Sequence, residues 1–334
     1  MEMSKPKKVR VRNHEVFFQL TKRNFLVFTR NKMRMFFTLM VPIIILIIYI
    51  LFLRSLELSS IREAINSIEG IPPIDDKTLM VFMDSWFLSG NVALCSISIS
   101  LQTNNLIIND KENGINRDFA SAPIHKTVVT FAYMFFNFLI TLLLCFCFVC
   151  VTFIFLAAMN EFYLNALDVL IIFGVLAFIT LNASAFTTLV CSFIDTDATL
   201  ASVIAVVSAC LGFLIGSFMP LSLMPKLMQD IVFFIPGTHA TALMRYAYLK
   251  SPLEILGNQF NPTQLSILKN QVGYNLIFYI RDMMTSVDLS VDPILQGGAV
   301  ITPDIQAYIT TGFTCGFMGL NFLSRKNTVK TYIK

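Results

Sequence analysis

Six stretches of the chain contain no charged residue for 19 or more consecutive positions, and this feature limits the possible folds most. A helix rises about 1.5 Å per residue and needs roughly 20 apolar residues to cross a hydrocarbon core of about 30 Å. Only 14% of the residues are charged, against about 25% in a typical soluble domain. We therefore expect an all-α polytopic membrane protein. Its six transmembrane helices are predicted at about 35–53, 85–109, 127–157, 169–194, 198–223 and 305–324, within a membrane domain at 33–324.

A seventh apolar run, Ile231 to Met244, is too short to cross the membrane. It contains 14 residues and is interrupted by Pro236-Gly237. Non-helical backbone at membrane depth is tolerated only where protein or water satisfies it. The run is predicted to form a short re-entrant hairpin on the outer side, at the start of an outer segment at 226–304.

The distribution of Lys and Arg predicts the orientation. An even number of spans places both termini on one side, and that side carries 17 of the 25 basic residues, in 1–34, 110–126 and 325–334. Cytoplasmic segments are enriched in Lys and Arg. The tails at 1–12 and 325–334 are therefore expected in the cytoplasm. The outer segments contain no usable Asn-x-Ser/Thr sequon, which is consistent with a bacterial plasma membrane.

Residues 13–31 are predicted to form an amphipathic interfacial helix before the first span. At 100° per residue, the basic residues Lys22, Arg23 and Arg30 lie opposite an apolar arc, and such a helix can lie in the membrane interface. The alternative is a helix that simply extends the first span and breaks near Asn31. The apolar arc comprises Val16, Phe17, Leu20, Val27 and Phe28.

The segment 110–126 between the second and third predicted spans is the most informative part of the chain. Ile115, Phe119 and Ala122 are spaced to share one face of a short helix. Gly114 can provide a turn before this helix, and Pro123 would end it. A short surface helix with a Phe anchor is suited to docking in a partner's groove. An ordinary solvated loop is the alternative.

The sequence resembles the transmembrane subunits of type II ABC exporters, the ABC-2 permeases. Asp110-Lys111-Glu112-Asn113-Gly114 followed by Pro123 matches the acidic-basic-acidic-x-Gly run and the later Pro of the family's first cytoplasmic loop. The amphipathic helix at 13–31 matches the family's connecting helix. Ile235 to His239, continuing to Arg245, resembles the family's segment of paired short helices between spans five and six.

The resemblance implies an exporter driven by a separate cytosolic ABC ATPase subunit, which would bind ATP and Mg. It also implies a second permease subunit, as a homodimer or heterodimer, and contact with membrane lipid. The cargo would be an amphipathic drug, peptide or lipid-like molecule. The implied ATPase-coupling residues are Glu112, Gly114, Phe119 and Pro123; the implied outer-gate residues are Pro236, Gly237, His239 and Arg245; and the implied dimer-packing residues are Gly212 and Gly216. For this glycine pair, packing within the chain is the alternative.

Motifs that would indicate enzymatic chemistry are absent from the sequence. It contains no G-x-x-x-x-G-K-[ST] phosphate loop, no H-E-x-x-H and no G-x-S-x-G. We therefore expect no catalytic residue, no bound cofactor and no nucleic-acid partner. Cys145 and Cys147 would point about 200° apart on a helix, so thiols facing lipid or core are favoured over a metal site with Cys150.

An ion-coupled secondary transporter or a channel is the alternative function, and a membrane enzyme is a weaker one. Ion-coupled carriers place ionisable residues at mid-membrane. The candidates in this sequence all lie near predicted span boundaries, which favours the ATP-driven reading. Asp84 is the residue to test, because a longer second span would bury it. The candidates are Arg54, Asp84, Asp168 and Asp304.

Overall fold

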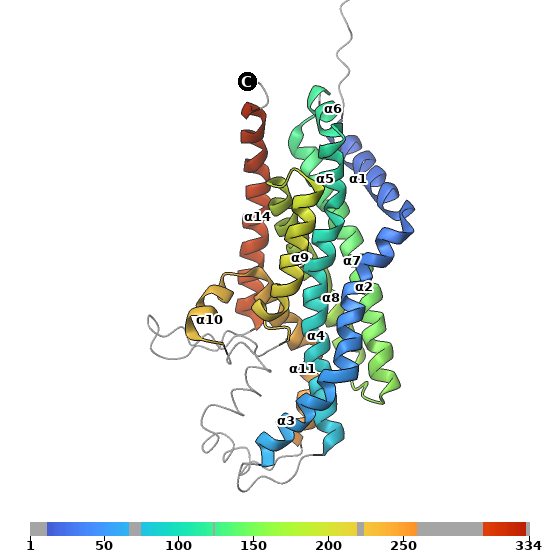
Figure 1. Cartoon of the computed structure of the whole chain (residues 1–334), viewed down its shortest axis with the longest axis vertical. Coiled ribbons are helices and arrows are strands. Elements are labelled where there is room, and N and C mark those ends of the chain that lie inside the picture. Colours follow the sequence, from blue (N-terminus) through green and yellow to red (C-terminus); the bar gives the residue numbers. More distant parts are fainter. Residues whose placement is uncertain (1–11, 67–74, 123, 219–223, 259–302, 332–334) are drawn as a thin grey trace, which may run out of the picture.

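The computed structural model describes residues 12–66, 75–122, 124–218, 224–258 and 303–331, and the regular structure in these ranges is helical (Figure 1). The elements are α1 (Asn13–Arg30), α2 (Lys32–Ile48), the π-helical turn η1 (Tyr49–Leu53), α3 (Arg54–Asn66), α4 (Asp76–Thr103), α5 (Asn105–Glu112), α6 (Ile115–Ser121), α7 (Lys126–Ala158), α8 (Ala166–Ser192), α9 (Asp197–Leu214), α10 (Lys226–Phe233), α11 (Pro236–Asn258) and α14 (Pro303–Thr331).

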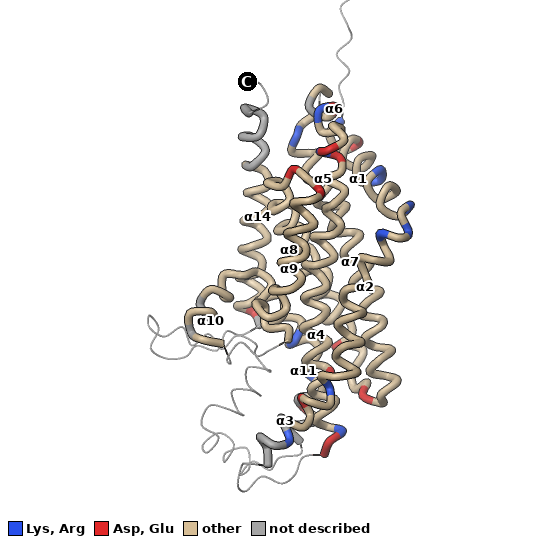
Figure 2. Tube along the Cα trace, viewed as in Figure 1, with Lys and Arg blue, Asp and Glu red and all other residues tan. Residues whose placement is uncertain are grey.

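Five helical stretches in the described residues are long and apolar enough to cross a membrane. They are Lys32–Ser59, Asp76–Glu112, Lys126–Ala158, Ala166–Ser192 and Asp197–Leu214. These stretches run along the long axis of the molecule, and charged residues gather mainly toward its two ends (Figures 1 and 2). The structure thus confirms an all-helical chain with several candidate membrane spans.

The sixth predicted span lies in α14, which is a continuous helix of 29 residues. It packs against α8 and α11, and its C-terminal end lies at the same end of the bundle as α1 and α6 (Figure 1). Polar residues such as Gln306 and Asn321 lower its apolar character, and it is not among the five stretches. The count of six spans therefore stays a prediction.

The bundle is built around α4, which is buried along nearly its whole length. It packs against α2, α7, α8, α9 and α11. Polar side chains on α4 bond to neighbouring helices: Ser100 Oγ donates to Asn137 Oδ1 at 3.0 Å, and Asn104 Nδ2 donates to Thr187 Oγ1 at 2.9 Å. Because buried polar groups are costly unless bonded, these contacts fix how α4, α7 and α8 pack together.

The first two predicted spans are longer in the structure than charge counting indicated. The first helix continues through η1 and α3 to Asn66 rather than ending at 53, and α4 begins at Asp76 rather than at 85. Arg54 and Asp84 lie at the predicted span boundaries, but their side chains form an ion pair with Nη2–Oδ2 at 3.0 Å. Because paired charges can be buried within a bundle, neither residue ends its helix.

The fifth predicted span is shorter than expected, because α9 ends at Leu214 rather than near 223. Gly216 adopts the left-handed conformation with φ of 72°. The Ser217 N–H donates to the Gly212 carbonyl at 2.8 Å, and the Gly216 N–H donates to the Phe213 carbonyl at 3.0 Å. This pair of bonds is the Schellman arrangement that ends helices.

Contacts within the chain therefore explain the two glycines that were predicted for dimer packing, Gly212 and Gly216. Gly216 lies beyond the end of α9, so the two glycines do not form a stripe along one helix. A Cβ atom at Gly212 would lie 2.1 Å from the Phe218 ring, so this glycine makes room for a neighbouring side chain. The structure supports the alternative of intramolecular packing, and a role in a dimer is not tested.

The predicted short hairpin corresponds to α10 and the first part of α11. The two helices are separated by a turn at Phe234-Ile235, and Pro236 is the first residue of α11. This is the helix position that best tolerates a proline, because its N–H would have no helical partner. α11 then continues to Asn258, well past Met244, and packs closely on α4. Most of the outer segment predicted at 226–304 lies outside the described residues.

Candidate functional site

The segment that carried the family resemblance forms a compact helical turn at one end of the bundle, here called the α5–α6 end. α5 continues from α4 after a shift at Asn104. Gly114 follows in the left-handed conformation with φ of 76°, and α6 begins at Ile115. Ala122 is extended, so α6 stops directly before Pro123, which lies outside the described residues. The predicted short helix and the Gly114 turn are confirmed.

Asp110 links this turn to α1 and α7. Its side chain is nearly buried, and Oδ1 accepts a hydrogen bond from Arg23 Nη2 at 3.0 Å. Oδ2 accepts from Arg23 Nη1 and from the Tyr133 hydroxyl. The hydrogen bond with Asp110 is the largest influence on the pKa of Arg23, and it raises that pKa. A buried carboxylate with a bidentate guanidinium partner gives a strong, directional contact.

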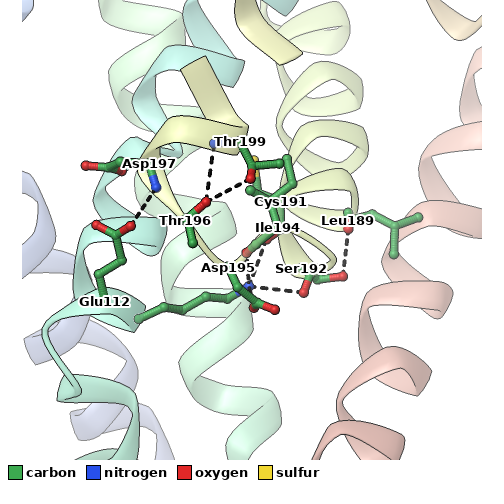
Figure 3. Close-up of polar contacts among 10 residues, drawn as sticks. Glu112, Leu189, Cys191, Ser192, Ile194, Asp195, Thr196, Asp197 and Thr199 are labelled. Atoms are coloured by element: carbon green, nitrogen blue, oxygen red, sulfur yellow. Dashed lines mark hydrogen bonds and ion pairs between the residues drawn. The ribbon is translucent and has the colours of Figure 1, made fainter. Parts of the chain in front are cut away.

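Lys111 binds the C-terminal end of α8, where Figure 3 labels Cys191 and Ser192. Its ammonium group donates to the carbonyl oxygens of Cys191 at 3.0 Å and Ser192 at 3.1 Å, and also to that of Ile194. It lies 3.3 Å from Asp195 Oδ1. Carbonyl groups at a helix C-terminus lack helical partners and carry partial negative charge, so a lysine is well suited to this position.

Glu112 binds the N-terminal end of α9. Its Oε1 accepts from the backbone N–H of Asp197, the first residue of α9, at 2.8 Å (Figure 3). Thr196 caps the same helix by accepting from the Thr199 N–H at 3.3 Å. Free N–H groups at a helix N-terminus favour a carboxylate. The residue predicted to contact a partner thus also holds a neighbouring helix of its own chain.

Together, Asp110, Lys111 and Glu112 (the charged triplet) fix four helices from three consecutive positions. Asp110 holds α1 and α7, Lys111 holds α8, and Glu112 holds α9. The sequence indicated a dense run of charge here, but not its partners. Apart from Tyr133, those partners lie 80 to 87 positions away in sequence, so no local pattern could identify them.

Phe119 was predicted to anchor the short helix in a partner's groove. In the structure it is half-buried and packs, together with Ile124, against the main apolar cluster of the chain. The exposed face of α6 instead carries Arg117, Asp118 and Ser121. These residues are the ones that a partner could reach directly. In the sequence, these exposed residues could be identified by their position opposite the apolar face of the predicted short helix.

The predicted interfacial helix is present as α1, separated from α2 at Asn31. Its apolar arc is divided between two environments. Phe17 contacts Phe135 with ring centroids 5.5 Å apart, and Phe28 contacts Phe136 at 5.9 Å, both on α7. Val27, predicted on the same arc, is 42% exposed. The apolar residues Phe18 and Leu26 are also exposed. α1 therefore packs on the bundle with one side and presents apolar groups outward on another.

The four residues predicted for an outer gate lie in the first part of α11 and are all buried. The Arg245 guanidinium carbon lies 4.1 Å from the Trp86 ring centroid, and Arg245 Nη2 donates to the Gly216 carbonyl. His239 Nε2 lies 2.9 Å from the Phe233 carbonyl. Gly237 faces Ile215 and Ile97 so closely that a Cβ atom would lie 2.7 Å from each. The structure thus joins these residues to the end of α9.

The cysteines give no indication of a site. Cys145 is buried while Cys147 is exposed, as expected for positions on different sides of a helix. Among the described residues, no group of three or more His, Cys, Asp or Glu side chains is placed to hold a metal ion. All seven cysteines are free thiols.

Comparison with known proteins identifies one family. The family model described as "ABC-2 type transporter" matches residues 15–249, which is more than two thirds of the chain. The match begins in α1 and ends within α11. It includes the charged triplet and all four residues of the predicted outer gate. No curated protein sequence gives a significant match.

Proposed function

Because the chain belongs to the ABC-2 type transporter family, we propose that it is the membrane-spanning permease subunit of an ATP-driven exporter. The sequence contains no phosphate loop, so a separate cytosolic ABC ATPase subunit would bind and hydrolyse ATP. The cargo would be an amphipathic drug, peptide or lipid-like molecule. The permease would lie in a plasma membrane with both termini cytoplasmic, in keeping with the basic residues at the chain ends, and the composition fits a bacterial source.

The observation that supports this proposal most directly is the placement of the charged triplet beside α6. An ATPase subunit would contact the exposed face of α6, at Arg117 and Asp118, and displace it. The displacement would reach α1, α7, α8 and α9 together, because the triplet bonds to all four. Because spanning helices satisfy their own backbone hydrogen bonds, they can shift within the bilayer as rigid units.

The remaining features of the chain fit such a complex. α9 buries only Leu200, Leu211 and Gly212, and α2 also exposes much of its apolar surface, so both leave faces for lipid or for a second permease subunit. With α14 as the sixth span, the C-terminus returns to the side of α1. The pair α10 and α11 would form the re-entrant hairpin that shapes the exit at the opposite end.

The first experiment is purification from native membranes in mild detergent, with mass spectrometry of the proteins that co-purify. A stoichiometric P-loop ATPase is expected. Its recovery should fall sharply in the charge-reversal variant Arg117→Glu/Asp118→Lys, whose changes lie on the exposed face of α6. Arg12→Glu, an exposed change on the N-terminal side of α1, is the matched control. Failure to recover an ATPase in several mild detergents would contradict the proposal.

The alternative function, an ion-coupled carrier or a channel, is favoured by one observation. Asp84 is fully buried on the central helix α4, whereas the sequence placed it at a span boundary. A carrier of this kind would transport substrate in liposomes without ATP and would lose activity in Asp84→Asn. Transport that requires both ATP and the partner ATPase would exclude this alternative.

A further inference from the structure

A second group of charged residues lies at the other end of the bundle, here called the α3 end. It joins Arg54 at the start of α3, Asp84 on α4 and Glu161 in the connection between α7 and α8. Arg54 Nε lies 3.2 Å and 3.1 Å from the two Asp84 carboxylate oxygens, and Arg54 Nη2 lies 2.6 Å from Glu161 Oε1. One guanidinium group thus holds one carboxyl group from α4 and another from the connection between α7 and α8.

The charges in this group do not balance. The Asp84 side chain is fully buried and that of Glu161 is 3% exposed, while Arg54 provides one positive charge. Among the described residues, the other groups in contact with these carboxyl groups do not supply another cation. The Tyr49 hydroxyl donates to Asp84 Oδ1 at 2.7 Å, and Glu57 on α3 adds a third carboxyl close enough to act on Asp84 through its charge. Burying an excess negative charge is strongly unfavourable.

Two details show how the imbalance is relieved. Glu161 Oε2 is buried and has no hydrogen-bond partner among the described residues. Glu161 Oε1 and Asp84 Oδ2 both contact Arg54 Nη2, at 2.6 Å and 3.0 Å, so the two carboxyl groups are close neighbours. Two carboxylates repel each other, whereas a carboxyl and a carboxylate that share one proton form a short, strong bond. A single added proton would therefore satisfy the free oxygen and leave Asp84, Glu161 and Arg54 without net charge.

We propose that Asp84 and Glu161 form a proton-binding site at the α3 end, in which one proton is shared between the two carboxyl groups and the single negative charge that remains pairs with Arg54. The environment of Glu161, which lies outside the membrane-spanning stretches, agrees with this site. Burial, the hydrogen bond with Asp84 and the charge of Asp84 together raise the pKa of Glu161 to about 8, against the opposing effect of Arg54. The proton is thus held at neutral pH and released in mildly alkaline medium.

The surroundings of the site allow a proton to arrive from water. A cavity of about 330 Å³ lies beside Arg54 and is lined by polar and exposed groups, including Ser55, Ser59 and Arg62. Glu161 itself follows Asn160, whose left-handed backbone with φ of 55° makes a tight turn at the exposed end of α7. The orientation in the proposed function would place this end outside the cell, so the site would sense external pH.

Occupancy of the site affects how three elements are held together. With the proton bound, Arg54 joins the first helix to α4 and to the connection after α7. Without it, the group carries excess negative charge and the contact with Glu161 is weakened. The π-helical turn at Tyr49–Leu53 directly precedes Arg54, and such turns are frequent at functional sites. Proton binding would therefore favour the arrangement in which Arg54 holds these three elements together.

Infrared difference spectroscopy on the full-length chain, with any partner that co-purifies, tests this site. Between about pH 6 and about pH 9, we expect loss of one C=O band of a protonated carboxyl group, with a midpoint near 8. The band should be missing in Glu161→Gln. It should also be lost near neutral pH in Asp84→Asn, because Glu161 then pairs with Arg54 alone and ionises.

Asp76→Asn is the matched control, since Asp76 lies at the same end of the bundle but pairs with Arg62 at an exposed position. This variant should keep the band and its midpoint. A band that is unchanged in Glu161→Gln, or no titrating carboxyl in the wild type, would overturn the proposal. Because the measurement needs neither ATP nor transport, neither result bears on the proposed exporter function.

Discussion

At the scale of single residues, the charged side chains of this protein act through specific partners rather than through net charge. The two buried ionic groups lie at opposite ends of the bundle, one around Asp110 and the other around Arg54. In each, a guanidinium from one helix holds a carboxylate from another. Such pairs are weak evidence for added stability, but breaking one partner is costly, because it leaves a buried charge without its counterion.

The raised pKa of Glu161 predicts how stability depends on pH. The ordinary value for the carboxyl is 4.5 and the folded value is about 8, so the folded state binds the proton more tightly. Its contribution to stability is fully present below about pH 4.5 and is lost as the pH rises through 8. The Tm of the wild type should fall by a few degrees between about pH 6 and about pH 9. In Glu161→Gln this fall should be smaller, and Asp76→Asn should behave as the wild type; equal falls in all three would contradict the assignment.

Gly114 provides a residue-scale test of the turn before α6. Its φ of 76° is unfavourable for residues with a Cβ atom, although a Cβ here would meet no other atom within 4 Å. Gly114→Ala should therefore lose about 1 kcal/mol through backbone strain alone and should misplace α6. Transport should fall more than ATP hydrolysis. Gly114→Asn is the control, because Asn tolerates the left-handed conformation; if Ala and Asn were equally harmful, strain would not be the cause.

At the scale of helices, the C-terminal end of α9 shows that the local sequence can determine where a helix stops. The Schellman arrangement at Gly216 predicts that Gly216→Ala destabilises the folded chain by about 1 kcal/mol, since Ala is strained at φ of 72°. Thermal unfolding of the purified protein measures this effect. Gly316→Ala on α14, where a Cβ would meet nothing within 4 Å, should be nearly neutral. An unchanged Tm with loss of a dimer would favour the original interpretation of the glycine pair.

Local chemistry explains which elements could be predicted from the sequence. The helix at the start of the chain, the turn at Gly114 and the short helix after it each depend on neighbouring residues, and the structure contains all three. The helix that contains the second predicted span begins at Asp76 rather than at 85, because the buried Asp84 pairs with Arg54, which lies 30 positions earlier. The partners of Lys111 and Glu112 were missed for the same reason. Pairing across helices depends on packing, which a single sequence does not encode locally.

At the scale of the whole molecule, the position of α14 decides the topology. If α14 crosses the membrane, reporters fused to the N-terminus and to the C-terminus should both be cytoplasmic. Paired alkaline phosphatase and green fluorescent protein fusions distinguish the two sides, because each reporter is active on only one. A C-terminal reporter active outside would reduce the count to five spans, in which case α14 would lie against α8 without crossing.

Asp110 offers the most direct test of how movement passes through the bundle, because it bonds to α1 and α7 at once. Asp110→Asn keeps the shape but removes the charge that binds Arg23, so α6 and α5 could move without carrying α1 with them. The ratio of transport to ATP hydrolysis should fall by about 5-fold or more, the lower end of typical coupling between sites. Glu15→Gln, an exposed carboxyl on α1, is the matched control. A parallel loss of both activities in Asp110→Asn would instead indicate that the residue only supports folding, and the charged triplet would then hold the α5–α6 end together without transmitting its movement.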